Sequence, residues 1–297
     1  MKIINFKSIL VCLVLIYALY FVHQVQNSKF LDKKDSQSIA LDDQDDWKLI
    51  FQDEFEDKQV EESKWTKRYR THGNTEQQLY IEDDIYTENG NLVIRTRYNP
   101  TIYNLTGKLY NFTSGWLDSS QKFNFSEGRF EARVKLPKTK VNDPIWPALW
   151  TIGDGVSWLK GGEIDIFEMN SNWNGDKLPH LYGTYHWGNN ASDNHCHGCG
   201  TIYPNKINLN DYHVFRFDWN ATQFDWYIDN IHYKTNEQGV QYPKTDAPIT
   251  LPTYPQFIII NTAIDDFVQA KKADYPKYMY IDYIRVYQKK NTQNIQN

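Results

Sequence analysis

The sequence predicts an all-β protein whose main folded block, residues 47–288, is an antiparallel two-sheet β-sandwich. Apolar and polar residues alternate with period two in several short segments, and turn residues separate these segments. No long amphipathic helix competes with them, and no internal repeat divides the block. Many short strands joined by turns are typical of a sandwich or a barrel. For about 240 residues we expect a single sandwich domain.

The clearest strands follow one another towards the C-terminus. The first covers residues 129–136, where the residues of one face are Phe130, Ala132, Val134 and Leu136 and the other face is charged. Four further strands are expected at residues 213–219, 224–228, 257–260 and 279–287. Asn220-Ala-Thr-Gln223 is short enough to connect two of them as a hairpin.

The N-terminus predicts export from the cytosol. Lys2 and Lys7 precede an apolar run of 14 residues, 9–22, which suits a signal peptide and is short for a membrane span. No small-x-small cleavage site follows the run, so an uncleaved membrane tether is the alternative. Residues 1–26 are thus a signal peptide or signal anchor, residues 27–46 a polar spacer, and residues 289–297 a polar tail. The folded block would be secreted, or membrane-anchored outside the cytosol.

Five glycosylation sequons agree with this destination. They begin at Asn104, Asn111, Asn124, Asn190 and Asn220. In an exported eukaryotic chain some of them would carry glycans, although an Asn-rich chain also contains such triplets by chance.

Composition narrows the choice of partner. The net charge is −5 with both signs interspersed, so no basic stripe indicates nucleic acid. Aromatic residues make up 15% of the chain, including 10 Trp and 21 Tyr. Such rings fill cores, and they also pack on the apolar faces of sugars while their polar tips form hydrogen bonds. We expect a monomer.

The cysteines are few. Cys12 lies in the apolar run, which leaves Cys196 and Cys199 in a His-Cys-His-Gly-Cys cluster that begins at His195. In an exported chain this spacing favours a small disulfide loop. A zinc site built from two Cys and two His is the alternative, but its ligands usually come as two separated pairs.

The most informative segment is Gly161-Gly-Glu-Ile-Asp-Ile-Phe-Glu-Met-Asn170. Its apolar residues favour a strand. On a helix, Glu163 and Glu168 would diverge by roughly 140° and could not share a substrate. On a strand, Glu163 and Asp165 share a face, whereas Ile164 and Ile166 fill the core behind them.

A regular strand would give Glu168 the wrong parity. One β-bulge corrects this, because the extra residue shifts the alternation by one. The two glutamates then lie roughly 13 Å apart between Cα atoms, and their side chains can close to the ~5.5 Å typical of retaining glycosidases. One carboxylate would attack the anomeric carbon, and the other would protonate the leaving oxygen. An acidic outer strand face without chemistry is the alternative.

The surrounding motifs decide between these interpretations. The Glu163-to-Glu168 run resembles the bulged ExDxxE signature of glycoside hydrolase family 16, specifically its laminarinase-like members. Other similar motifs occur in the family's order across Trp47–Tyr287: Phe51-Gln-Asp-Glu-Phe55, Asn74-Thr-Glu76, Thr113-Ser-Gly115, Gly128-Arg-Phe-Glu-Ala-Arg-Val-Lys-Leu-Pro137, Trp146-Pro-Ala-Leu-Trp150, Gly183-Thr-Tyr-His-Trp-Gly188 and Asp282-Tyr-Ile-Arg-Val-Tyr287. One such signature is weak, but the ordered set is specific.

The resemblance implies a concanavalin A-like jelly roll with an open concave glycan cleft. It implies Glu163 as the nucleophile, Asp165 as its helper and Glu168 as the acid/base. The substrate-binding residues it implies are Trp146, Trp150, Asn74, Glu76 and a histidine near the acid/base, His186. No cofactor is required for catalysis. Some members bind a structural calcium ion, and Gly90 and Asp282 match those positions.

Three departures make the substrate less certain than the chemistry. Trp116 stands where many laminarinases have Arg, so a polar substrate contact is expected to be missing. Residues 265–268 replace a Gly-Gly-x-Trp motif, and the loop containing His195 looks like an insertion. The leading hypothesis is therefore an endo-acting, retaining β-1,3-glucanase. The alternatives are a mixed-linkage glucanase, a galactanase, a wall-remodelling transglycosylase and a non-catalytic β-glucan-binding protein.

Overall fold

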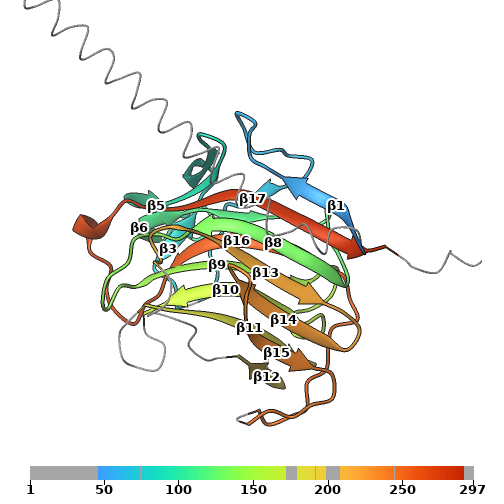
Figure 1. Cartoon of the computed structure of the whole chain (residues 1–297). Coiled ribbons are helices and arrows are strands. Elements are labelled where there is room, and N and C mark those ends of the chain that lie inside the picture. The colour runs from blue at the N-terminus through green and yellow to red at the C-terminus, as the bar shows by residue number, and fades with distance from the viewer. Residues whose placement is uncertain are drawn as a thin grey trace, which may run out of the picture. The chain divides into compact units, whose positions relative to one another are not determined.

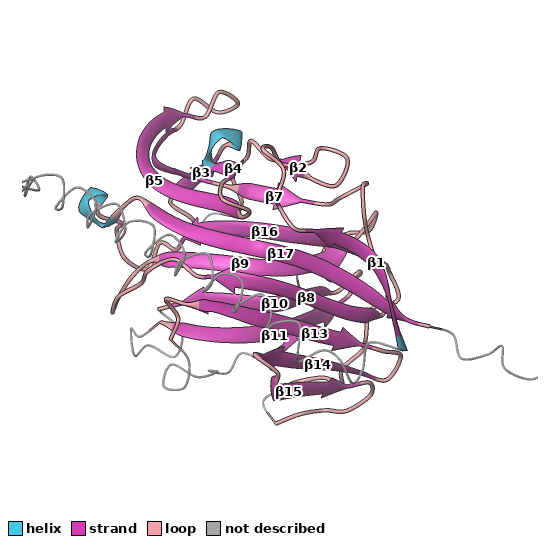
Figure 2. Cartoon of the chain, turned by 45° about the horizontal axis from the view of Figure 1, so that its top comes forward, coloured by secondary structure: helices cyan, strands magenta, loops and turns pink. Residues whose placement is uncertain are grey.

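The period-two alternation of the sequence forms β-strands that are joined by loops, and the helical elements among the described residues are short 3₁₀ turns (Figures 1 and 2). The computed structural model describes residues 46–73, 75–171, 179–190, 192–198, 208–243 and 245–290. A compact unit covers Leu49–Gln288, close to the predicted block 47–288. The predicted signal or anchor segment and most of the spacer and tail lie outside the described residues. No helix within the described ranges is long and apolar enough to cross a membrane.

The strands form two sheets. The seven-stranded sheet, called here the cleft sheet, has the order β12-β11-β10-β9-β16-β7-β2. Its strands are β2 (Thr66–Lys67), β7 (Trp116–Asp118), β9 (Ile145–Gly153), β10 (Glu163–Asn170), β11 (His180–Gly188), β12 (Asn194–His197) and β16 (Gln256–Ile264). All neighbours in it are antiparallel.

The ten-stranded sheet, called the outer sheet, has the order β15-β14-β13-β8-β17-β5-β6-β3, with β1 beside β17 and β4 beside β5. Its strands are β1 (Trp47–Asp53), β3 (Gln78–Tyr80), β4 (Ile85–Thr87), β5 (Leu92–Ile102), β6 (Leu109–Ser114), β8 (Gly128–Lys135), β13 (Tyr212–Trp219), β14 (Gln223–Ile228), β15 (Ile231–Glu237) and β17 (Lys277–Lys289). β3 and β6 are parallel. The 3₁₀ turns are η2 (Glu82–Asp84) and η4 (Lys272–Asp274).

All five predicted strands are present, as β8, β13, β14, β16 and β17. On β8, buried and half-buried residues alternate along the whole strand, as the period-two pattern predicts. The buried faces of the two sheets share one core, in which Ile164 and Phe167 of β10 pack with residues such as Phe215 and Phe217 of β13. The two-sheet sandwich is therefore confirmed, and its core fixes which face of β10 points outward.

Candidate active site

The predicted bulge lies in the middle of β10. Opposite β11, Asp165 pairs with Thr184 and Glu168 with Tyr182, so three steps on β10 match two on its neighbour. Opposite β9, Asp165 and Phe167 pair with the consecutive residues Trp150 and Leu149. The extra residue shifts the alternation, as expected. Glu163, Asp165 and Glu168 therefore all line one cleft.

Each glutamate is held by an indole. Trp158 Nε1 donates to Glu163 Oε2 at 2.5 Å. Trp146 Nε1 donates to Glu168 Oε1 at 2.9 Å. These hydrogen bonds fix the carboxylates at the two ends of the catalytic strand, and each favours the ionised form of its acceptor.

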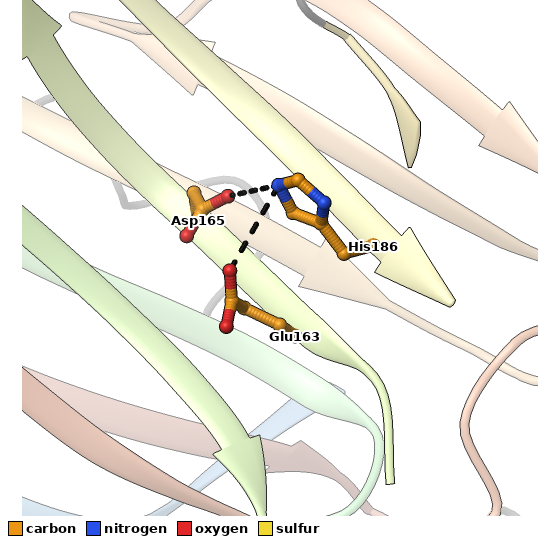
Figure 3. A group of neighbouring side chains, drawn as sticks. All are labelled: Glu163, Asp165 and His186. Carbon is orange, nitrogen blue, oxygen red and sulfur yellow. Dashed lines mark ion pairs between the residues drawn. The ribbon is translucent and has the colours of Figure 1, made fainter. Parts of the chain in front are cut away.

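Asp165 lies between them with a histidine beside it (Figure 3). His186 on β11 pairs with Glu163 in the strand register. Its Nε2 is 3.6 Å from Asp165 Oδ2 and 3.8 Å from Glu163 Oε1. The resemblance implied a histidine near the acid/base, Glu168, and the structure places it beside Glu163 and Asp165 instead. These three side chains also make a donor set for a divalent ion, with ligand atoms within 4.8 Å of one another.

The outer sheet supports this group from below. Trp226 of β14 is fully buried, and its Nε1 donates to the backbone oxygen of Asp165 at 2.9 Å. Lys234 of β15 lies over the Trp226 ring, 4.0 Å from its centroid. Its Nζ donates to the backbone oxygens of Gly183 and His197, at 3.1 and 2.7 Å. A half-buried cation thus lies beneath Asp165 and its neighbours.

The pKa values of the two glutamates differ in the order that the roles implied by the resemblance require. Burial raises the pKa of Glu163 to about 7, and the hydrogen bond from Trp158 limits the rise. Burial and the charge of Glu163 raise the pKa of Glu168 to about 8, against the hydrogen bond from Trp146. The acid that must stay protonated therefore has the higher pKa.

The pKa values of Asp165 and His186 are also shifted by their surroundings. Burial and the charges of Glu168 and Glu163 raise the pKa of Asp165 well above its usual range, and Lys234 opposes the rise. The shift favours the protonated form of Asp165 relative to an exposed aspartate. Burial lowers the pKa of His186 to about 4, so its imidazole is neutral.

The cleft extends from these acids across β9, β16 and β7. It has a volume of about 510 Å³ and is lined by residues that include Trp146, Trp150, Glu76, Arg70 and His72. Trp150 Nε1 donates to Asn261 Oδ1 at 2.7 Å, which leaves only the indole ring for a ligand. Burial raises the pKa of Glu76 to about 7, against hydrogen bonds from Tyr80 and Gln78. An open channel with indoles, polar groups and paired carboxylates suits a polymeric sugar.

The predicted site residues have three outcomes. Glu163, Asp165, Glu168, Trp146, Trp150 and Glu76 line the cleft, and His186 lies beside the acids. Asn74 and Cys199 lie outside the described residues, so the polar contact and the disulfide stay predictions. The expected insertion around His195 contributes β12, the edge strand of the cleft sheet, on which Cys196 pairs with His186.

The residues predicted for calcium lie far from the acids in the fold. Gly90 precedes β5, and the pairing of Leu92 with Ile281 brings it to the same end of the β5–β17 ladder as Asp282. The Asp282 carboxylate accepts a hydrogen bond from Arg133 Nη1 at 2.9 Å. A Cβ built on Gly90 would lie 3.1 Å from Glu56 Oε2, so a second carboxylate is close. These oxygen donors fit the chemistry of Ca²⁺.

Several functional residues were missed by the sequence reasoning. Trp158 lies in the loop before β10, and nothing in the residues around it distinguishes it from a core tryptophan. Trp226 and Lys234 belong to the other sheet, so only the tertiary structure brings them under β10.

The carboxylate geometry and the cleft define a carbohydrate-active protein of the two-sheet sandwich class. Comparison with known proteins gives its family. The model of glycosyl hydrolases family 16 matches residues 72–285, and the chain belongs to that family.

Individual relatives agree with this family assignment. A glucan endo-1,3-beta-glucosidase A1 from Niallia circulans is 30% identical over 80% of this chain and 37% of its own length. A beta-glucanase from Rhodothermus marinus is 27% identical over 81% of this chain and 85% of its own. The laminarinase catalytic domain from Thermotoga maritima superimposes with a TM-score of 0.66 at 28% identity, over 83% of this chain and all of that domain. The chain spans little more than a third of the Niallia relative.

The pKa order predicts a pH profile displaced from the ordinary range of carboxylic acids. Activity requires Glu163 ionised, so it falls as the pH drops below about 7. It also requires Glu168 protonated, so it falls as the pH rises above about 8. We therefore expect kcat/KM to follow a narrow, bell-shaped pH profile with its maximum near neutral pH. Its two limbs reflect the titration of Glu163 and Glu168, which interact with each other. A plateau from pH 4 to pH 6 in initial-rate measurements would contradict this.

Trp158→Phe tests the acid limb of that profile. The change removes the hydrogen bond that lowers the pKa of Glu163, so the acid limb should move to higher pH. The alkaline limb should stay, because Glu168 is held by Trp146. Full pH profiles of both proteins measure this, and an unchanged acid limb would show that the indole does not tune Glu163.

Gly183→Ala tests the support under β10. A Cβ at this position would lie 2.6 Å from Cδ1 and 2.7 Å from Nε1 of Trp226. Such overpacking costs about 1–3 kcal/mol and would displace the indole that holds Asp165. We expect a lower midpoint in chemical denaturation together with a lower kcat. Gly155→Ala, which has no atom within 4 Å of its Cβ but a φ of +70°, shows the cost of backbone strain without overpacking and should leave kcat unchanged.

Proposed function

We propose that this chain is an endo-acting β-1,3-glucanase that retains the anomeric configuration. The observation that carries the proposal is the bulge in β10, which places Glu163, Asp165 and Glu168 along one face of an open cleft. Glu163 attacks the anomeric carbon, and Glu168 protonates the leaving oxygen. Water activated by Glu168 then releases the sugar from Glu163. A cleft that extends from β10 across β9, β16 and β7 can accept an internal stretch of polymer.

The linkage preference is supported by the relatives, which include a glucan endo-1,3-beta-glucosidase and a laminarinase. The decisive experiment compares products from laminarin, mixed-linkage glucan and galactan, with Glu163→Gln as the blank. We expect laminarin to give a series of oligosaccharides, and proton spectra to show the β-anomer first. No turnover of laminarin would overturn the substrate. Products longer than the starting oligosaccharide at high acceptor concentration would make the chain a transglycosylase.

We also propose that the enzyme acts outside the cytosol. The apolar run 9–22 supports this, and so does the exposure of the asparagine in all five sequons. N-terminal sequencing of the mature protein separates a cleaved signal peptide from a retained anchor. A mass shift after deglycosylation tests the sequons, and a full-length, unglycosylated cytosolic product would contradict export.

A structural calcium ion is a further proposal, held by the Asp282 carboxylate and the Gly90 backbone oxygen. Ca²⁺ at a hundredfold excess over its Kd would raise the free energy of unfolding by about 2.7 kcal/mol. Thermal unfolding with Ca²⁺ and with a chelator measures the effect, and Asp282→Asn should remove it. Equal melting temperatures in the two conditions would contradict the site.

A further inference from the structure

Arg70 and His72 form a polar lip at the end of the cleft that lies farther from β10. The Arg70 guanidinium lies over the Trp116 ring, 4.5 Å from its centroid. The His72 ring is 5.0 Å from Trp116 and 6.0 Å from Trp150, measured between centroids. Trp116 is only 2% exposed, so a ligand at this end meets the guanidinium and the imidazole rather than the indole face.

The lip rests on a fixed base. The backbone of Arg70 exchanges two hydrogen bonds with Tyr80, at 3.2 and 2.9 Å. Trp116 Nε1 donates to Asp118 Oδ2 at 3.1 Å, and Arg68 binds both oxygens of that carboxylate at 2.6 and 2.7 Å. The ring under Arg70 therefore cannot turn freely, and the guanidinium is held at one place in the cleft.

The hydrogen bonds within the lip determine which N–H groups of Arg70 and His72 remain available to a ligand. Arg70 Nη2 lies 3.2 Å from His72 Nδ1. Because a guanidinium only donates, Nδ1 accepts, and the proton of a neutral imidazole is on Nε2. The pKa of His72 is lowered to about 4, by desolvation and by the charge of Arg70, so this neutral form dominates although the side chain stays exposed. Arg70 Nε donates to the Thr71 backbone oxygen at 3.1 Å.

Arg70 differs from Arg68 in its ion pairing. Arg68 is neutralised by Asp118, whereas Arg70 makes no ion pair with a carboxylate among the described residues. Its Nη1 and the Nε2–H of His72 are left as donors in the cleft. The acids nearby, Glu76 above all, make this end unsuited to an anionic substituent, so uncharged hydroxyl groups are the matching acceptors.

We propose that Arg70 and His72 form a remote subsite that binds hydroxyl groups of a neutral glucan unit away from the cleaved bond. The proposal deepens the proposed function and rests on it. Trp116 was expected to remove a polar contact, and the Arg70 guanidinium lies over its ring. β7 is separated from β10 by three strand spacings, about 14 Å. This is more than one sugar ring, so only longer glucan chains reach Arg70, whereas His72 extends the subsite back towards Trp150 on β9.

The length of the glucan substrate therefore provides the test. Arg70→Met removes the donors and keeps the aliphatic stem over Trp116. With long β-1,3-gluco-oligosaccharides or laminarin we expect KM to rise about tenfold at nearly constant kcat, since a hydrogen bond from a charged group is lost in ground state and transition state alike. With the shortest cleaved oligosaccharides both constants should match the wild type. Arg216→Met is the control for the loss of a guanidinium over an aromatic ring, 3.7 Å from the Tyr227 centroid on the outer sheet; because Arg216 also pairs with Asp218, a melting curve accompanies its kinetics.

Binding without turnover gives an independent readout. In a Glu163→Gln background, Arg70→Met should weaken binding of long oligosaccharides in calorimetry and leave that of short ones unchanged. Arg70→Lys, which keeps the charge, should lose less, and it replaces Arg70→Met if that variant does not fold. Equal losses for short and long chains, or no loss at all, would overturn the subsite. Failure of the wild type to cleave or bind any β-1,3-glucan would instead overturn the proposed function.

Discussion

Replacing Glu163 with Gln is expected to reduce the rate of glucan hydrolysis by about 10⁵-fold, because the glycosyl-enzyme can no longer form. The substitution keeps the size of the side chain and an oxygen that accepts from Trp158, so the cleft should stay intact. Melting curves and oligosaccharide binding should therefore match the wild type while kcat collapses.

The control for this experiment is Glu131→Gln on β8 of the outer sheet. Burial also raises the pKa of Glu131, but the residue does not line the cleft. Its loss should leave the hydrolysis rate unchanged. A smaller nucleophile variant, Glu163→Gly with azide, should release a glycosyl azide of inverted configuration. Residual activity of Glu163→Gln within tenfold of the wild type would exclude Glu163 as the nucleophile.

Replacing Glu168 with Ala should separate the two halves of the reaction. For a glucan, whose leaving alcohol needs a proton, we expect a loss of about 10²–10⁴-fold. For an aryl glycoside with an acidic phenol, formation of the glycosyl-enzyme needs no acid and should proceed nearly normally. Hydrolysis of the intermediate still needs the base, so it should accumulate and appear as a burst of phenol.

Added azide should restore turnover of the aryl substrate, because azide attacks without a base and gives a product of retained configuration. The pH profile adds a second readout, since the alkaline limb assigned to Glu168 should disappear. Equal losses on the glucan and on the aryl substrate would show that Glu168 is not the acid/base.

Much of the site could be predicted because parity on a strand is a strict rule. Ile164 and Ile166 had to be buried, so Glu168 could join Glu163 only through a bulge, and the register of β10 confirms it. Several strands of the outer sheet could be predicted in the same way from the alternation of apolar and polar residues. Their order could not be predicted, because β8 lies between β13 and β17 only through contacts between distant parts of the chain.

The side chains that tune the acids could not be predicted for a related reason. Trp158 reaches Glu163 from a loop, and Lys234 reaches the site from β15 of the opposite sheet. Neither position differs in its local pattern from an ordinary core or surface residue. The lip of Arg70 and His72 likewise depends on the bridge to Tyr80, which joins two segments without a shared motif.

The hydrogen bond from Trp226 to the Asp165 backbone has a consequence for how this chain can vary. Trp226 cannot touch a sugar from the interior, yet any replacement would release the carbonyl next to the bulge. Gly183 is restricted with it, because the indole occupies the space that a side chain there would need. A change at either of these interior positions, in two different sheets, would therefore reach the acids through the core, although neither residue lines the cleft.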